Sequence, residues 1–396
     1  MSEDLDQTAW SPFAADVMED PGNGHAQLLH QCPVHRFDQF EPPFYTLSRF
    51  SDVQQALRDT ETFSSEYGQG PRFTPPQGML CDPPQHTHMR SLIQPAFTPG
   101  AMRLLAPRIH DLTHQLIDEI LAGPDTFDLH DDFAFPLPVL IIAGLLGVPE
   151  SDLEQFKAWS DVQVAAMGSA DPTQYADQQA EFAAYLESQL TTRQQALNQG
   201  ETVTNDLLTL IAQAKQPDGT AVEQADALSM LSQLLVGGNE TTTSLITNVM
   251  WRLLQHPDQL QLLQRDRSWL LPAIEESLRF DPPVLGLYRN TTRDVTVAGT
   301  KIPAHSKVYL YYAAANRDPA VFHDPDAFNI TRDRKRHLAF GSGLHFCLGA
   351  PMARLEAEIA LQALLDRLPS LSLLNDGERI APFFLWGRRR LPVTKA

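Results

Sequence analysis

Apolar residues at helical spacing dominate the middle of this 396-residue chain, from about residue 83 to residue 279. Such a period of three to four residues predicts helices that bury one face against other helices. The clearest predicted helices span residues 102–121, 156–167, 175–197, 225–255 and 348–368. Strand-like patterns are fewer and shorter, at residues 44–47, 295–297 and 307–312. The sequence therefore predicts a mainly α fold with small β-sheets, and not the alternating units of a parallel sheet.

Length, composition and charge narrow the class of protein. With 43% hydrophobic residues and no repeat or low-complexity linker, we expect residues 1–396 to form a single domain. About residues 1–20 are expected to be a flexible N-terminal segment. A formal charge of −19 argues against a nucleic-acid-binding protein. The N-terminus does not read as a signal peptide, and the apolar stretch 139–148 is too short to span a bilayer. We therefore expect a cytoplasmic protein without a membrane anchor.

Cysteine is rare in this chain, and one of its three cysteines has unusual neighbours. Cys32 and Cys81 read as small buried residues. Cys347 lies in the sequence FGSGLHFCLG, whose glycines permit turns and a close approach to a bulky partner. The predicted helix 348–368 begins directly after it, and the free amides of a helix N-terminus favour a thiolate. That thiolate could be a metal ligand or, together with His345, part of a nucleophile–base pair.

The predicted helix 225–255 has a weak centre. It contains the sequence GGNETTTS, in which Gly237 and Gly238 each cost about 1 kcal/mol relative to alanine. Glycine lets a large planar ligand lie against the backbone. The Thr241 hydroxyl can bond the Gly237 carbonyl four residues earlier and open a local groove, and Glu240 adds a titratable group beside it. The alternative interpretation is close packing of two helices through small residues.

Together, these two motifs resemble those of the cytochrome P450 family. The haem-binding signature of that family is F-G-x-G-x-H-x-C-x-G, and this chain matches every fixed position from Phe340 to Gly349. The family's central helix carries (A/G)-G-x-(D/E)-T-(T/S), which the segment GGNETT fits. By motif and order the resemblance extends from about Asp82 to Arg390. It implies the fold of that family, with haem b between the long central helix and the cysteine loop. It also implies a soluble, bacterial-type haem-thiolate monooxygenase that uses O2.

The resemblance gives expected roles to individual residues. Cys347 is expected to be the axial thiolate ligand of the haem iron. Glu240 and Thr241 are expected to form the path that delivers protons to dioxygen. The other residues expected to hold the haem are His86, Arg90, Gly237, Arg289, Phe340, His345 and Gly349. From the residues alone, His86 and Arg90 could instead form the solvated basic face of a helix.

Another acid–base pair, Glu276 and Arg279, lies three residues apart on one predicted helix. Exposed pairs of this kind contribute little to stability, so the spacing alone is a weak signal. The pair resembles the E-x-x-R motif of the family, which braces the loops around the cysteine, and we expect a structural role for it. The arginine of the family's later P-x-R-F motif is Ala327 here, which leaves open what satisfies Arg279 on that side.

The expected substrate pocket lies over the haem face opposite Cys347. Its expected lining residues are Met79, Leu80, Gln233, Val236, Leu285, Leu287 and Phe384. Most of these residues are apolar, which favours a hydrophobic substrate such as a terpenoid, a steroid, a fatty acid or an aromatic compound. Gln233 lies one turn before Gly237 and could anchor a polar group of the substrate.

A basic stretch precedes the cysteine loop in this acidic chain, and its cations are Arg332, Arg334, Lys335 and Arg336. A solvated loop is the simpler interpretation, and a docking patch for an acidic partner is the more specific one. The resemblance implies that this partner is an acidic iron–sulfur ferredoxin served by a flavin reductase. Alternative functions on the same fold are a peroxide-driven peroxygenase, a non-catalytic haem sensor, and desaturation or ring coupling at the same iron.

Overall fold

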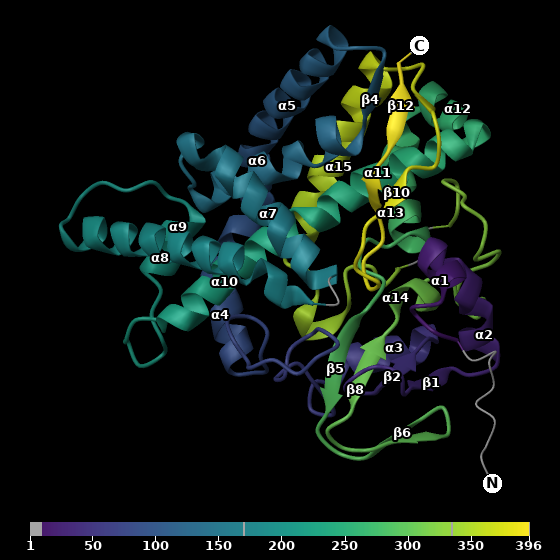
Figure 1. The fold of residues 1–396 in the computed structure, drawn as a ribbon, viewed down its shortest axis with the longest axis horizontal. Coiled ribbons are helices and arrows are strands. Elements are labelled where there is room, and N and C mark those ends of the chain that lie inside the picture. The colour runs from purple at the N-terminus through teal and green to yellow at the C-terminus, as the bar shows by residue number, and fades with distance from the viewer. Residues whose placement is uncertain (1–9, 169–170, 334–335, 396) are drawn as a thin grey trace.

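The computed structural model describes residues 10–168, 171–333 and 336–395, and its architecture is mainly helical (Figure 1). The longer helices are α4 (Gln85–Ile93), α5 (Pro99–Ala122), α6 (Pro136–Leu146), α7 (Leu153–Gly168), α8 (Ala176–Asn198), α10 (Gln224–Gly238), α11 (Glu240–Gln255), α12 (Pro257–Arg265), α13 (Leu270–Phe280) and α15 (Ala350–Arg367). Helix α3 (Phe50–Arg58) is as long as α4 and α12, and the shorter helices are α1 (Ala15–Glu19), α2 (His25–His30), α9 (Leu207–Ala212) and α14 (Tyr312–Ala315). The predicted fold class, mainly α with small sheets, is confirmed.

The largest sheet has five strands in the order β1 (Val34–Phe37), β2 (Phe44–Leu47), β8 (Lys307–Leu310), β5 (Leu287–Thr291) and β3 (Phe63–Ser64). Strands β2 and β8 are parallel, and the other neighbours are antiparallel. In one smaller sheet the central strand β12 (Pro392–Thr394) pairs with β4 (Thr126–Asp128) on one side and β9 (Ser372–Leu373) on the other. Two further sheets pair β10 (Glu378–Arg379) with β11 (Arg388–Arg390), and β6 (Val295–Val297) with β7 (Thr300–Ile302). The β-structure thus brings the N-terminal quarter of the chain beside residues 287–310.

The helix predicted over residues 225–255 is divided. Helix α10 ends at Gly238 and α11 begins at Glu240, because Asn239 has φ −90° and ψ −78° and interrupts the regular backbone. The other four predicted helices fall on α5, α7, α8 and α15 within a few residues. The strand predicted over 307–312 stops at Leu310, and a short helix, α14, follows it. In the centre of the molecule, α15 packs against both α5 and α11.

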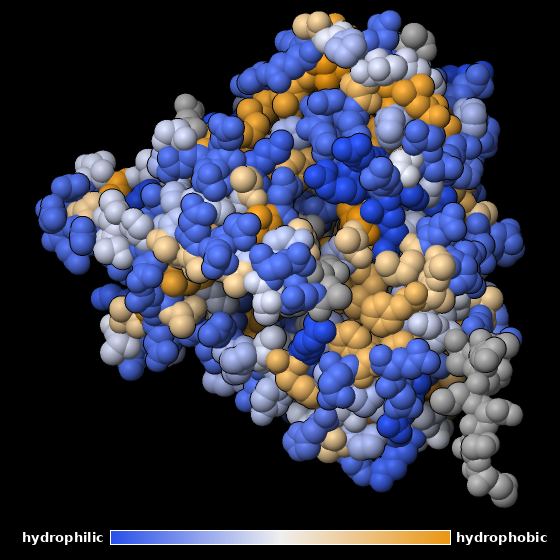
Figure 2. Space-filling view, in the orientation of Figure 1, coloured by the Kyte–Doolittle hydropathy of each residue, from blue (hydrophilic) through white to orange (hydrophobic). Residues whose placement is uncertain are grey.

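The N-terminal residues that the structure describes are packed against the sheet. Trp10 is only 4% exposed, and its ring lies 5.7 Å from that of Tyr311. Phe13 contacts Phe383, with ring centroids 4.7 Å apart. Figure 2 shows hydrophobic residues gathered on this face beside α1 and the loop that precedes β11. A flexible segment was expected over about residues 1–20; Trp10 and Phe13 are packed against the rest of the fold, and residues 1–9 lie outside the described part of the chain.

Candidate active site

The cysteine loop, residues 340–349, is closed by its own backbone. The Cys347 amide donates to the Phe340 carbonyl at 2.9 Å, and the Gly341 amide donates to the Leu338 carbonyl at 2.8 Å. Gly343 has φ +73°, and a Cβ at this position would lie 2.8 Å from the Leu57 carbonyl oxygen. Only glycine fits this left-handed backbone and this approach to the end of α3. The loop is therefore held against α3 in one conformation.

Cys347 lies at the floor of a cavity, where its side chain is exposed to the space above and surrounded by protein below. Burial raises the pKa of the Cys347 thiol. The backbone N–H groups of Gly349 and Ala350 act in the opposite direction because they donate to the sulfur at the start of α15, and the cations of Arg90 and Arg354 add to that effect. The sulfur thus has anion-stabilising donors on the protein side and open space on the other.

Two cavities meet above this sulfur and together form a slot between the α10–α11 junction and the cysteine loop. Gly237 and Cys347 line both cavities. The larger cavity, of about 240 Å³, is also lined by Thr241, Leu287, Arg289, Phe340 and His345. The smaller one, of about 160 Å³, is also lined by Met79, Gln233 and Gly349. The structure therefore brings residues from both sequence motifs to one space.

Two imidazoles at the edge of this slot have unused polar atoms. The rings of His86 and His345 lie 4.0 Å apart, and His86 is only 1% exposed. Within the described residues, neither Nδ1 of His86 nor Nε2 of His345 has a hydrogen-bond partner. Burial lowers the pKa of His86 to about 4 and that of His345 to about 2, so both rings are neutral at pH 7. A buried polar atom without a partner is costly, so these atoms await an acceptor or donor that the chain itself does not provide.

Two arginines lie beside these imidazoles. Arg289, on β5, is buried, and its Nη1 donates to the Tyr288 carbonyl at 2.8 Å. Burial lowers the pKa of Arg289, against the opposing effects of Tyr312 and the Asp82 carboxylate, and no ion pair joins Arg289 to a carboxylate within the described residues. Arg90, on α4, donates from Nη2 to the Phe346 carbonyl at 2.7 Å, and so links α4 to the cysteine loop. The interpretation of His86 and Arg90 as a solvated basic face is wrong for His86, which is buried.

The break between α10 and α11 faces the slot. The Thr241 hydroxyl donates to the Gly237 carbonyl at 2.7 Å, as the sequence predicted. The side chain of Asn239, at the break itself, contacts the Ser160 hydroxyl on α7 through a hydrogen bond. Two side chains thus build the groove that the sequence predicted at this point. The Thr241 hydroxyl takes the place of a helical backbone hydrogen bond, and Asn239 is hydrogen-bonded to the neighbouring helix α7.

Glu240 lies directly behind Thr241. Its side chain is only 5% exposed, and burial raises its pKa to about 7. The Ser244 hydroxyl donates to Glu240 Oε1 at 3.4 Å and acts in the opposite direction. Of the described residues around the two cavities, Thr241 lines the larger one and Glu240 lines neither. A pKa raised into this range suits a group that both takes up and releases protons near neutral pH.

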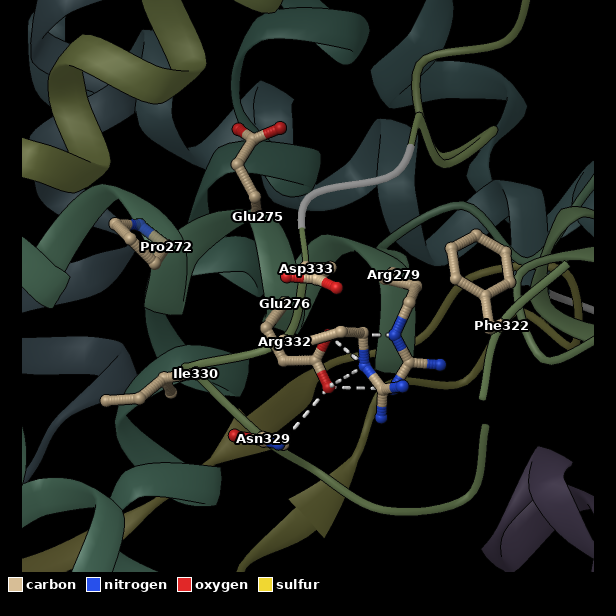
Figure 3. Close-up of a pocket in the computed structure, with 9 residues that line it drawn as sticks. All are labelled: Pro272, Glu275, Glu276, Arg279, Phe322, Asn329, Ile330, Arg332 and Asp333. Carbon is tan, nitrogen blue, oxygen red and sulfur yellow. Dashed lines mark hydrogen bonds and ion pairs between the residues drawn. The ribbon is translucent and has the colours of Figure 1, made fainter. Parts of the chain in front are cut away.

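Glu276 and Arg279 form a buried pair, unlike the exposed pair that the spacing alone suggests. Figure 3 shows both side chains pointing toward each other beneath Arg332. Nε and Nη2 of Arg279 each donate to the Glu276 carboxylate at 2.8 Å. Arg279 also donates from Nη1 to the Asn316 carbonyl at 3.1 Å. The Asn316 side chain in turn accepts from the Leu338 amide at 2.7 Å, so the network reaches the start of the cysteine loop.

Arg332 supplies the third arm of this network. Its Nε lies 3.1 Å from one Glu276 oxygen and 3.2 Å from the other (Figure 3). On the side where Ala327 departs from the family motif, the Ala327 and Pro325 carbonyls accept from Arg279 at 3.1 and 2.8 Å. The side chain of Arg332 is only 13% exposed, so its expected role as a docking residue is wrong. Arg332, five residues after Ala327, takes the place of the arginine that the family motif has at position 327.

The other residues of the predicted docking patch divide into two groups. Arg336 is exposed, and its guanidinium lies 5.8 Å from the ring of Phe346 in the cysteine loop. Leu344, in the same loop, is also exposed. Arg334 and Lys335 lie outside the described residues. Among the described residues of the predicted patch, Arg336 is therefore the exposed cation, and it lies next to Phe346 of the cysteine loop.

Gln233 does not offer a free amide to the cavity. Its Nε2 donates to the Gln77 carbonyl at 3.0 Å and to the Ser229 hydroxyl at 2.7 Å, and its Oε1 accepts from the Met79 amide at 3.1 Å. Asp226, two turns earlier on α10, accepts from the Gly78 amide at 2.8 Å. The expectation that Gln233 anchors substrate is therefore wrong for this conformation, because its hydrogen bonds hold the 77–80 turn against α10.

The remaining predicted pocket residues are only partly at the cavities. Met79 lines the smaller cavity and Leu287 the larger one, whereas Leu80, Val236, Leu285 and Phe384 are absent from the described lining of both. The prediction missed several lining residues: Leu245, Val284, Tyr312 and Ala339 in the larger cavity, and Phe97, Ile142 and Leu234 in the smaller. Leu245 could have been predicted from the sequence, because it follows Gly237 and Thr241 at successive intervals of four residues, the spacing of one helical face.

No helix in the described ranges is long and apolar enough to cross a membrane. The profile of the cytochrome P450 family matches residues 25–372. Cytochrome P450 monooxygenase PikC of Streptomyces venezuelae is 39% identical over 375 residues, which cover 92% of this chain and 88% of that protein. Vitamin D(3) 25-hydroxylase of Pseudonocardia autotrophica is 36% identical over 398 residues, which cover 96% and 95%.

Solved structures agree with this assignment. Cytochrome P450 CYP109Q5 from Chondromyces apiculatus aligns with a TM-score of 0.85 at 36% identity, over 96% of each chain. CYP109E1 from Bacillus megaterium in complex with corticosterone aligns with a TM-score of 0.84 at 32% identity, over 96% of this chain and 99% of that one. The matches extend over nearly the whole chain and include the cysteine loop and the α10–α11 junction. This chain belongs to the cytochrome P450 family of monooxygenases.

Proposed function

We propose that this protein inserts one oxygen atom of O2 into an apolar small molecule, with electrons supplied by a separate iron–sulfur ferredoxin and flavin reductase. The observation that carries the proposal is the slot in which the Cys347 sulfur faces Gly237 and Thr241. A nucleophile–base pair of Cys347 and His345 is less well supported, because burial keeps the His345 ring neutral and lowers its basicity.

The residues around the slot fit a haem with two carboxylate side chains. Family membership implies a cysteine thiolate ligand, and Cys347 is the cysteine whose sulfur faces the slot. Arg289 is a buried cation without a carboxylate partner among the described ion pairs, and His86 and His345 each have one unused ring nitrogen. The haem carboxylates at this edge of the slot would offset the free-energy cost of burying these three side chains, and Arg90 lies beside them. When bound, haem supplies the redox-active iron at which O2 is reduced.

The protein's own part in the chemistry is to deliver protons and exclude water. The Thr241 hydroxyl lies in the larger cavity and donates its hydrogen to the Gly237 carbonyl, which leaves its oxygen free to accept a hydrogen bond from a water molecule in the cavity. Glu240, one residue earlier and buried, can give a proton toward that hydroxyl and be reprotonated, because its pKa is about 7.

Thr241→Ala is expected to separate oxygen consumption from product formation. The variant keeps the cavity and Cys347 but loses the hydroxyl. O2 is then still reduced, but the hydroxyl no longer directs where it is protonated. We expect the yield of product per O2 consumed to fall about a hundredfold, with peroxide released instead. Thr242→Ala, a buried neighbour on the same helix, is the matched control and is expected to keep the yield. An unchanged yield in Thr241→Ala would contradict this proton path and would support a peroxide-driven enzyme.

The lining of the slot supports an apolar substrate. Leu245, Val284, Leu287 and Ala339 line the larger cavity, and apolar walls select apolar ligands. One relative is named as a vitamin D(3) 25-hydroxylase, and a solved neighbour was crystallised with corticosterone. Vitamin D(3) and corticosterone are both apolar polycyclic compounds. We therefore propose this class of substrate ahead of fatty acids.

An optical titration of the haem-loaded protein tests the substrate class. Graded steroids, terpenoids, fatty acids and aromatics are added, and the spin state of the haem is followed by absorbance. We expect steroids to displace iron-bound water, to shift the spectrum to high spin and to bind more tightly than fatty acids of equal carbon number. A shift with fatty acids alone would overturn the steroid assignment. Failure of the protein to take up haem would overturn the proposed function itself.

A further inference from the structure

Two histidines on helix α5 lie one turn apart and face each other. His110 and His114 are separated by four residues, a spacing that places both side chains on one face of a helix. Their Nε2 atoms are 3.1 Å apart, and the centroids of the two rings are 4.2 Å apart. His110 has 62% of its side chain open to solvent, and His114 is half-buried. Neither ring lines the slot above Cys347, so the oxygen chemistry makes no use of this pair.

The separation of the two nitrogen atoms is the one that a single metal ion requires. Zn²⁺ binds imidazole nitrogen at about 2.0–2.1 Å, so two nitrogens on one ion are about 2.9 Å apart at a right angle and about 3.3 Å apart at the tetrahedral angle. The observed 3.1 Å lies between these two values. The backbone of α5 therefore already holds both nitrogens at the distance at which one ion can bind them together.

The groups beside the other nitrogen of each ring determine where the ring proton lies. Asp111 Oδ1 is 4.0 Å from Nδ1 of His110, and a carboxylate there favours a proton on Nδ1, which leaves the Nε2 lone pair free. Nδ1 of His114 instead faces Nη1 of Arg367 at 3.4 Å, a donor that favours a lone pair on Nδ1 and a proton on Nε2. The Nε2–H of His114 then donates to Nε2 of His110 when no ion is bound.

The chemistry of the pair selects a class of ion. Imidazole nitrogen is a good ligand for Zn²⁺, Cu²⁺ and Ni²⁺, whereas Mg²⁺ and Ca²⁺ prefer oxygen. Within the described residues, no group of three or more His, Cys, Asp or Glu side chains could hold a metal ion. Water would therefore complete the coordination of an ion held by His110 and His114.

We propose that His110 and His114 bind one divalent transition-metal ion, Zn²⁺ or Cu²⁺, through their two Nε2 atoms at the surface of α5. Asp111 is a positioning residue that keeps the proton of His110 on Nδ1. When the ion binds, the proton of His114 moves from Nε2 to Nδ1; no proton leaves the pair, and nothing is oxidised or reduced. This site is independent of the proposed function.

Ion binding at this site is opposed by a contact with the neighbouring helix. Helices α5 and α15 lie side by side, and Arg367 is in the last turn of α15 (Figure 1). Arg367 also donates from Nη2 to Asp118 at 2.7 Å, which holds its guanidinium beside His114. A proton on Nδ1 of His114 removes the acceptor that Nη1 of Arg367 faces, and the guanidinium adds a positive charge near the ion. The bound ion therefore competes with Arg367 for His114.

Calorimetric titration of the haem-loaded enzyme with zinc chloride, and separately with copper sulfate, tests the site. We expect one ion per chain, with Cu²⁺ bound more tightly than Zn²⁺. His110→Ala and His114→Ala are each expected to weaken binding at least about tenfold, because a single imidazole cannot chelate. The control His323→Ala removes a lone exposed histidine that also lies beside an aspartate, Asp324, at 2.9 Å, and is expected to keep the affinity.

A swap of two adjacent residues provides a sharper test, because it leaves the composition of the chain unchanged. In the double variant His114→Gln/Gln115→His the second ring follows His110 by five residues, which places it about 140° away around the helix. We expect this variant to lose the ion as His114→Ala does. If it binds zinc or copper as tightly as the parent enzyme, the ion lies elsewhere and the proposal is wrong. Absence of binding to the parent enzyme would also overturn the proposal, while the proposed function would stand.

Arg367→Met tests the competition with α15. The variant removes the donor that faces Nδ1 of His114 and a positive charge beside the ion, so we expect zinc to bind about three- to tenfold more tightly. Arg103→Met, exposed on α5 about two turns before His110, is the matched control and is expected to leave the zinc affinity unchanged. Unchanged or weaker zinc binding in Arg367→Met would contradict the proposed shift of the His114 proton.

Discussion

Replacement of Cys347 by serine is expected to abolish oxygen transfer. Cys347 faces the slot with its sulfur, and the amides of Gly349 and Ala350 donate to that sulfur from behind. A serine hydroxyl fits the same space, but its proton is not released near neutral pH. The strongly donating thiolate that favours O–O cleavage is therefore lost. We expect no measurable product, and an absorbance spectrum of the reduced carbon monoxide complex that lacks the signature of thiolate ligation.

The chain provides two matched controls for this experiment. Cys81 is buried, and its Sγ donates to the Gly78 carbonyl at 3.2 Å; burial raises the pKa of its thiol to about 12. Cys32 is half-buried, and burial raises the pKa of its thiol too. Neither sulfur lines the described slot, so Cys32→Ser and Cys81→Ser are expected to keep both the spectrum and the product. A normal carbon monoxide spectrum in Cys347→Ser would show that another residue ligates the iron.

Local sequence patterns were sufficient to predict the parts of the site whose contacts join residues a few positions apart in the chain. The Thr241 hydroxyl bonds the carbonyl four residues earlier, a contact that depends on helical geometry alone, and the structure has it at 2.7 Å. The cysteine loop likewise follows from closely spaced glycines, with Gly343 at a backbone angle that favours glycine. Helices with clear apolar periodicity, such as α5 and α15, were placed within a few residues for the same reason.

Contacts between distant segments could not be read in this way. The break at Asn239 depends on Ser160, which lies 79 residues earlier in the chain. Gln233 looked available to substrate because its bonds to Gln77 and Met79 cross more than 150 residues. Trp10 looked like part of a loose terminus because Tyr311, which it contacts, lies far from it in the sequence. Helical spacing fixes which face a residue occupies, but not what covers that face.

Arg332 is the clearest example of this limit, and it leads to a prediction about stability. In the sequence it begins a basic stretch, and its basic neighbours favour a solvated or a docking role for its side chain. In the structure it completes a buried network with Glu276 and Arg279, and Glu276 also accepts from the Asn329 amide at 2.9 Å. Replacing Glu276 by glutamine leaves two buried guanidinium groups without their anion. We expect the free energy of unfolding to fall by about 3–5 kcal/mol, measured by urea titration of the haem-loaded enzyme.

Arg332→Met and Arg336→Met form the matched pair that decides between the two roles. Arg332→Met removes one arm of the network and is expected to destabilise the enzyme by about 1–3 kcal/mol. It should also loosen the haem, because Arg279 and Asn316 transmit the network to Leu338 at the start of the cysteine loop. Arg336→Met, at an exposed position, is expected to change stability by less than about 0.5 kcal/mol and to weaken binding of an acidic electron donor. The opposite pattern, with weaker donor binding in Arg332→Met at unchanged stability, would restore Arg332 to the docking surface. It would also require that the side chain leave Glu276 in solution.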